Sequence, residues 1–209
     1  MTDQKLPAEL NRIKILQLLL YARGIKNEEG EPIVGRTRLQ KEVFLVQQEL
    51  HRRGVKSLYP FRPYKKGPLS YELYNDLDWL KYSGRVREDF SHLADGTPYS
   101  IFSLPKGRLP EIRKLLKEQP WPKVFEIIEE IKKATNGMNL TYLVESVHGS
   151  YPEYMIKEPV AKLLASLAKL HGLELLEQPM DSTKKKVLKS SMTDEIRRLR
   201  DGLDLEGVS

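Results

Sequence analysis

Residues 51–67 bring cations and aromatic rings together without a carboxylate. The stretch reads HRRGVKSLYPFRPYKKG, and its cations are Arg52, Arg53, Lys56, Arg62, Lys65 and Lys66. These six charges equal the formal net charge of the whole chain, which is +6. Such a surface suits phosphate groups or an acidic partner. Tyr59, Phe61 and Tyr64 offer stacking faces, but alternate apolar residues of an extended segment usually pack, so we expect Phe61 and Tyr64 in the core.

The acids Glu72, Asp76 and Asp78 follow this segment. Glu72 and Asp76 are four residues apart and therefore lie on the same side of a helix. Two such carboxylates could hold Mg²⁺ for phosphodiester cleavage. That chemistry also needs a nearby lysine and a suitable sheet, which the sequence does not indicate. We favour a solvated acidic face in which the helix dipole stabilises Glu72.

No other pattern in the sequence indicates catalysis. The histidines lack a second ligand at metal-binding spacing; they are His51, His92, His148 and His171. The chain contains no glycine-rich phosphate loop and no nucleophile elbow. Cysteine is absent, which excludes disulfides and thiol catalysis and fits a reducing compartment. We expect a protein that is not an enzyme and that binds no metal and no cofactor.

Composition is that of a globular protein, with 40% hydrophobic and 31% charged residues among 209. No apolar run approaches the ~18 residues of a membrane span. The first twelve residues lack the basic lead and hydrophobic stretch of a secretory signal. We expect a cytoplasmic location and no membrane contact.

Periodicity and turn signals predict the elements that position these residues. Helices are expected over 6–23, from a capping box at Thr37 and Gln40 to Gly54, over 70–83 behind an N-cap at Ser70, and from 109 onward. The prolines of 57–68 predict an extended segment, and 26–35 is expected to be a loop. Asp95-Gly96 predicts a β-hairpin over 85–104. This order is typical of a mainly α (α+β) winged helix-turn-helix domain with a β-hairpin wing.

Composition shifts divide the chain into three parts. We expect a winged-helix-like domain over 5–118, a small helical C-terminal extension over 119–180, and a charged amphipathic tail over 181–209. The extension should contain helices over 124–134, 140–147 and 159–171. The tail either docks as a helix or mediates a homodimer.

Three segments resemble a known family. They are GRTRLQKEVFLVQ (35–47), FRPYKKGPLSYELYNDLDWLKYSG (61–84) and YPEY (151–154). They are similar to the YwgA-like proteins and, more distantly, to the SocA-type (Panacea) antitoxin domain. The matching residues are Leu39, Gln40, Lys41, Lys66, Gly67, Pro68, Glu72, Leu73 and Tyr74. Lys66 stands where the antitoxin group usually has tyrosine. The resemblance implies a helical, winged-helix-like domain that binds a toxin, DNA or both.

Two functions follow. The leading one is regulatory binding of nucleic acid, with duplex DNA expected before RNA. The helix over 70–83 has a net charge of −2 and is a poor major-groove reader. The expected phosphate contacts are therefore Arg36, Arg38, Lys41, Arg52, Arg53, Lys56, Arg62, Lys65, Lys66, Arg85 and Arg87. The alternative is a protein-interaction module, such as an antitoxin or a defence-complex subunit, that binds its partner through Tyr71, Tyr74, Asn75 and Asp78.

Overall fold

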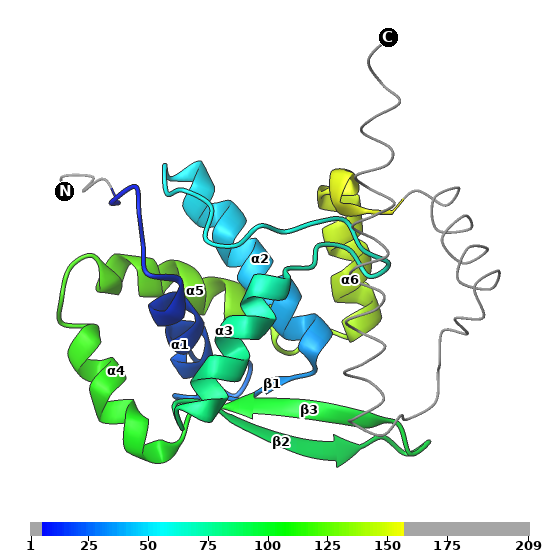
Figure 1. Cartoon of the computed structure of the whole chain (residues 1–209), viewed down its shortest axis with the longest axis horizontal. Coiled ribbons are helices and arrows are strands. Elements are labelled where there is room, and N and C mark those ends of the chain that lie inside the picture. Colours follow the sequence, from blue (N-terminus) through cyan, green and yellow to red (C-terminus); the bar gives the residue numbers. More distant parts are fainter. Residues whose placement is uncertain (1–5, 157–209) are drawn as a thin grey trace, which may run out of the picture. The chain divides into compact units, whose positions relative to one another are not determined.

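The structure is a computed structural model that describes residues 6–156, and Figure 1 shows helices gathered against a small sheet. The helices are α1 (Arg12–Tyr21), α2 (Arg36–Arg52), α3 (Tyr71–Tyr82), α4 (Leu109–Leu115), α5 (Trp121–Thr135) and α6 (Leu140–Ser150). Short 3₁₀ turns occur at Lys106–Arg108 and Pro152–Tyr154. The expected α+β class is confirmed, with helix predominating.

The sheet is antiparallel, and its strands lie in the order β1 (Ile33–Val34), β3 (Pro98–Ser103) and β2 (Arg87–His92). The predicted hairpin is confirmed as the β2–β3 pair. Its turn is closed by the Thr97 amide, which donates to Asp95 Oδ1 at 2.9 Å, and by Gly96 at φ +81°. β1 was missed within the predicted loop because two residues carry no measurable alternation.

α1 is the central helix. It begins behind Asn11, whose side chain accepts from the amides of Ile13 and Lys14, so it starts later than the predicted residue 6. Residues 15–21 are all buried, because α4, α5 and β3 pack around the helix. A helix that is apolar on every side belongs in a core, and this one joins the sheet to the outer helices.

The expected domain boundary near residue 118 is not a break in the core. Val124 and Ile128 of α5 belong to the same buried cluster as α1 and α3. The helix predicted over 140–147 is α6, which runs on to Ser150. The helix predicted over 159–171 and the tail over 181–209 lie outside the described residues. Within the described range, none of the helices has both the length and the apolar composition for crossing a bilayer.

A buried ammonium group joins α5 to the end of α1. Lys132 is fully buried, and its Nζ donates to the carbonyl oxygens of Ala22 at 2.8 Å and Leu19 at 3.0 Å. A further contact reaches the carbonyl of Glu31, which precedes β1. The last carbonyls of a helix have no partner within the helix, and a cation suits the negative end of its dipole. Lys132 therefore fixes the chain reversal between α1 and β1.

Glu42 is the buried counter-charge in the same region. Thr135 donates to its Oε1 at 3.1 Å, while Oε2 has no hydrogen-bond partner among residues 6–156. Burial raises the pKa of Glu42 to about 7, against the opposing effect of Lys132. Burial lowers the pKa of Lys132 to about 8. Both groups lose hydration on folding, so the pair positions helices more than it stabilises them.

Replacing the ammonium should destabilise the fold strongly. In Lys132→Met the carbonyls of Leu19, Ala22 and Glu31 lose their donor, so we expect the free energy of unfolding to fall by about 3 kcal/mol or more. Lys133→Met removes the same charge one residue away, where the lysine pairs with Glu129 at 3.1 Å in solvent, and should cost less than about 1 kcal/mol. Urea denaturation measures both. Equal losses would contradict the role given to Lys132.

The pH dependence of stability should report on Glu42. Its folded-state pKa lies above the value in the unfolded chain, so its contribution to stability is fully present below pH ~4.5 and is lost as pH rises through about 7. Glu42→Gln cannot ionise. The variant should therefore gain stability relative to the native chain as pH rises from ~4.5 to ~7, measured by urea denaturation across that window. A difference that stays constant with pH would contradict the shift.

Candidate nucleic-acid interface

The basic-aromatic segment forms a hairpin-like loop between α2 and α3, here called the basic loop (residues 60–69). The amide of Arg62 donates to Leu69 O at 2.8 Å, and the Leu69 amide returns the bond at 3.0 Å. The tip is closed by the Gly67 amide, which donates to Tyr64 O at 2.9 Å. Gly67 has φ +81°, a conformation that residues with a Cβ rarely adopt. The loop therefore has a defined shape despite its prolines.

Side chains of α2 supply the backbone partners that the loop lacks. At its entrance, Gln47 Oε1 accepts from the amide of Tyr59 at 2.7 Å, and Gln47 Nε2 donates to Tyr59 O at 3.1 Å. At its exit, Gln40 makes the same two-way contact with Ser70, at 2.8 and 3.0 Å. The two glutamines are about two helical turns apart on one face of α2. Gln40 makes this contact instead of the predicted capping box, since α2 begins behind Gly35 without a side-chain cap.

Lys41 is the third side chain of α2 that binds the backbone of this segment, after Gln47 and Gln40. It is almost fully buried, and its Nζ donates to Pro68 O at 2.8 Å. Burial, together with the nearby ammonium of Lys66, lowers the pKa of Lys41 to about 8. Figure 1 shows the segment between α2 and α3 crossing α2 toward α6, and Tyr64 forms a β-bridge with Met155 beyond α6.

Three cations of the basic loop project into solvent. Arg62, Lys65 and Lys66 are exposed. Ion pairs within residues 6–156 do not include any of them. Their charges are therefore not neutralised within that part of the chain. A compact group of unpaired cations on a fixed loop is suited to bind phosphate oxygens.

Most other cations expected to contact phosphate have carboxylate partners. Arg52 and Arg53 both pair with Glu49, at 3.1 and 2.9 Å. Lys56 pairs with Glu9, Arg36 with Glu88 and Arg87 with Asp89, each at 2.6 Å. Arg85 lies over the Trp79 ring, 5.4 Å from its centroid. These partners already engage the cations, and the carboxylate of Glu88 is itself buried, so these residues are secondary contacts at most.

Arg38 and Lys41 are corrections to the expected set. The Arg38 guanidinium is buried and donates to the carbonyls of Thr135 and Met138 at the end of α5. Lys41 is held by Pro68 as described above. Both side chains satisfy backbone groups in the interior, so neither is available to a phosphate. Sequence spacing alone does not separate these inward cations from outward ones, because both kinds of residue lie in one turn of α2.

The aromatic residues of the loop divide between core and surface. Tyr59 is buried, and Phe61 packs edge-to-face on Phe44 with ring centroids 5.1 Å apart, as expected. Tyr64 was expected in the core but is 44% exposed, because the turn at Gly67 directs the tip outward. Tyr71, at the start of α3, is 51% exposed. Burial raises the pKa of Tyr71, Tyr64 adds to the rise and Arg62 opposes it, so the three side chains share one area.

The residues expected to bind a protein partner lie on α3. Tyr71, Asn75 and Asp78 are exposed, and Asp78 pairs with Lys81 at 2.7 Å. Tyr74 is half-buried beneath Arg36, whose Cζ lies 5.7 Å from its ring centroid. α3 also exposes Trp79 and Tyr82, the latter at 94%. The exposed face of α3 is therefore rich in aromatic side chains.

The carboxylates that suggested a metal site serve different partners. Asp76 is buried and its Oδ1 accepts from Arg12 Nη2 at 2.9 Å, whereas Glu72 accepts from Ser70 Oγ at 3.0 Å. Residues 6–156 contain no group of three or more acids and histidines arranged to hold a metal ion.

Comparison of the chain with protein-family models found no match, and comparison with curated proteins found none either.

Gly67 should be intolerant of a side chain. A Cβ there would lie 2.9 Å from ring atoms of His148, in addition to requiring a positive φ. Gly96 has the same φ of +81° but has nothing within 4 Å of its Cβ position, so it is a matched control. We expect Gly96→Ala to lose about 1 kcal/mol and Gly67→Ala to lose about 1 kcal/mol more, measured by urea denaturation. Gly67→Ala with His148→Ser should recover the extra loss, and no recovery would contradict the contact.

Proposed function

We propose that this chain is a non-enzymatic nucleic-acid-binding protein that holds phosphate groups through Arg62, Lys65 and Lys66 of the basic loop. The observation that carries the proposal is their exposure without ion-pair partners among the described residues, on a loop fixed by Gln40, Gln47 and Lys41. A fixed loop loses little conformational freedom on binding. Tyr64 and Tyr71 lie beside these cations and offer faces for bases.

We further propose that residues 12–103 form a winged-helix-like unit. The order α1, β1, α2, α3, β2, β3 and the sheet order β1-β3-β2 support this assignment. The basic loop would then be an insertion between the second and third helices. In the usual arrangement the third helix and the wing contact DNA. Here α3 is acidic and Arg87 of β2 is paired with Asp89, which favours the basic loop as the contact.

Contacts between the motifs support the resemblance to YwgA-like and SocA-type proteins. The first motif contributes Gln40 and Lys41, and the second contributes Pro68 and Ser70. Their side chains and backbone bond to one another across the loop. Motifs that are separate in sequence therefore form one structural unit. We retain membership of that group as part of the proposal.

Charge removal at the basic loop should weaken binding selectively. We expect Arg62→Gln with Lys65→Gln and Lys66→Gln to lower affinity for duplex DNA at least ~10-fold and to reduce the salt slope of log K by about 2 to 3, since each phosphate contact contributes close to one. The matched control is Arg52→Gln with Arg53→Gln and Lys56→Gln. It removes the same charge from residues paired with Glu49 and Glu9 and should change affinity less than ~3-fold.

Salt-dependent titrations against duplex DNA, single-stranded DNA and RNA make this comparison. Equal losses in both triple variants would mean that net charge alone governs binding. Full retention of affinity in the first triple variant would refute the assignment of phosphate contacts to the basic loop. Circular dichroism of both variants checks that the fold is intact.

A protein-interaction module is the second candidate, because α3 exposes the large rings of Tyr71, Trp79 and Tyr82. Aromatic residues of this kind are enriched at the centres of protein interfaces. The partner would be a protein such as a toxin, bound at stoichiometric amounts. Loss of that partner from purified complexes with Tyr71→Ala and Tyr82→Ala, but not with the basic-loop triple variant, would favour this candidate over the first.

A further inference from the structure

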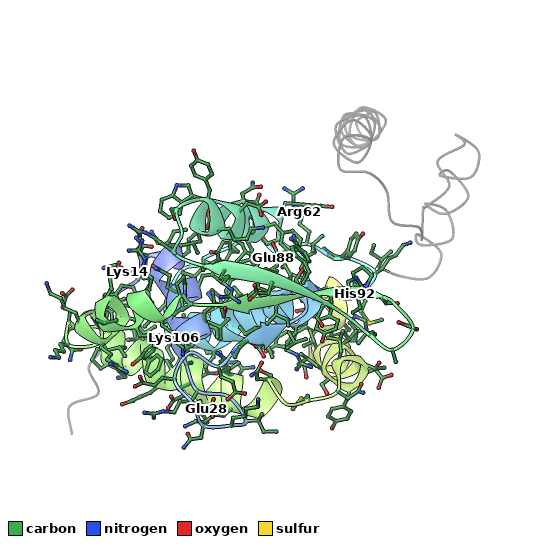
Figure 2. The ribbon with its side chains drawn as sticks, turned by 90° about the horizontal axis from the view of Figure 1, so that it is seen from below. Lys14, Glu28, Arg62, Glu88, His92 and Lys106 are labelled. Atoms are coloured by element: carbon green, nitrogen blue, oxygen red, sulfur yellow. The ribbon has the colours of Figure 1, made fainter. Side chains whose placement is uncertain are left out.

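A cavity of about 400 Å³ opens between α1, α3 and α4. Its apolar lining comes from Ile13 of α1, Trp79 of α3, and Ile112 and Leu115 of α4. The volume lies within the range of small-molecule sites, which combine apolar walls with a few polar groups. Figure 1 shows these three helices on the side of the described residues away from α6. Figure 2 labels Lys14 of this cavity and Arg62 of the basic loop, and the two are well separated.

A residue that lines the cavity has a hydrogen-bond donor without an acceptor. Gln17 lines it and is only 4% exposed. Its Nε2 has no hydrogen-bond partner among residues 6–156. A buried amide without a partner costs free energy unless something else accepts from it. The nitrogen is covered by its surroundings, so an oxygen atom of a bound molecule would fill that role once the Gln17 amide turns toward the cavity.

Cations predominate around the cavity. Lys14, Arg85 and Lys114 line it, and none of them pairs with a carboxylate of the described residues. Two carboxylates also line it: Glu111, which pairs with Arg108 at 3.2 Å, and the exposed Glu118. The remaining balance is positive.

The two best-placed cations lie over aromatic rings. Lys14 Nζ is 5.1 Å from the Trp121 ring centroid, and Arg85 Cζ is 5.4 Å from that of Trp79. Trp79 is part of the cavity wall and Trp121 is not, so the Arg85 contact is the one that holds a positive group against that wall. A ligand that carries both an apolar body and a negative charge matches this combination.

We propose that this cavity binds a small organic anion with a flat apolar body, such as an aromatic carboxylate or sulfonate. Its ring contacts Trp79, Ile112 and Leu115, its anionic group pairs with Arg85 and Lys14, and an oxygen accepts from Gln17. Because the lining comes from α1, α3 and α4, such a ligand holds the end of α3 against the central helix. The site is separate from the basic loop and does not depend on its function.

Calorimetric titration of the full chain with naphthalene-2-sulfonate tests the proposal. We expect saturable 1:1 binding, weakened ~10-fold or more in Lys14→Met with Arg85→Met, and several-fold in Gln17→Leu. Lys117→Met is a control for general charge effects, since it removes one charge from an exposed residue outside the cavity, and should leave affinity within ~2-fold. The uncharged 2-naphthalenemethanol should bind ~10-fold more weakly than the sulfonate.

A second readout locates the ligand. The chain has only two tryptophans, so the indole N–H signals of Trp79 and Trp121 are resolved in a nitrogen-15 NMR spectrum. Binding should shift the Trp79 signal. No saturable binding up to several millimolar, an unshifted Trp79 signal, or equal weakening by Lys117→Met would each overturn the proposal. If Gln17→Leu fails to fold, the lysine–arginine double variant still decides, because both of its residues lie at the surface of the cavity.

Discussion

The requirement that buried backbone groups be hydrogen-bonded governs this structure. Two segments, the reversal between α1 and β1 and the chain from α2 to α3, are largely irregular, so neither can satisfy all of its backbone groups by itself. Long polar side chains of neighbouring helices do it instead. Lys132 holds the carbonyls of the first segment, while Gln47 and Gln40 hold both ends of the second. Side chains of the helices therefore provide the hydrogen-bond partners that a neighbouring strand would provide in a sheet.

This arrangement separates the cations of the chain into two kinds. Arg38, Lys41 and Lys132 point inward and bind carbonyl oxygens, which makes them part of the scaffold. The basic loop carries cations that point outward, and among the inward cations Lys41 is the one that contacts this loop. Lys41 connects the two kinds, since it holds Pro68 and its pKa is lowered by burial and by Lys66. Unpaired cations on a loop held by hydrogen bonds suit the phosphate binding that we propose.

The sequence predicted much of the fold, because long periodic helices and a strong turn signal determine it. α2, α3, the hairpin at Asp95-Gly96 and the N-cap at Ser70 all followed from local pattern. β1 could not be predicted, since a two-residue strand exists only through its partner β3. The sequence showed that the cations cluster. It did not show which of them point into the interior and which point into solvent. Whether Arg38 faces α5 or solvent depends on how α5 packs on α2. The residues within one turn of α2 do not determine that packing. Tyr64 was placed wrongly for a similar reason, because the turn at Gly67 overrides the alternation of the extended segment.

The most direct test of the central claim is residue-level mapping of nucleic-acid contact by nitrogen-15 NMR. Titrating a short duplex and a single strand of the same sequence into the labelled chain reports which backbone amides sense the ligand. We expect shifts at residues 62–67 and at Tyr71, with the amides of Arg52, Arg53 and Arg87 little changed. Shifts confined to the second half of α3 and to β2, with the basic loop unaffected, would contradict it.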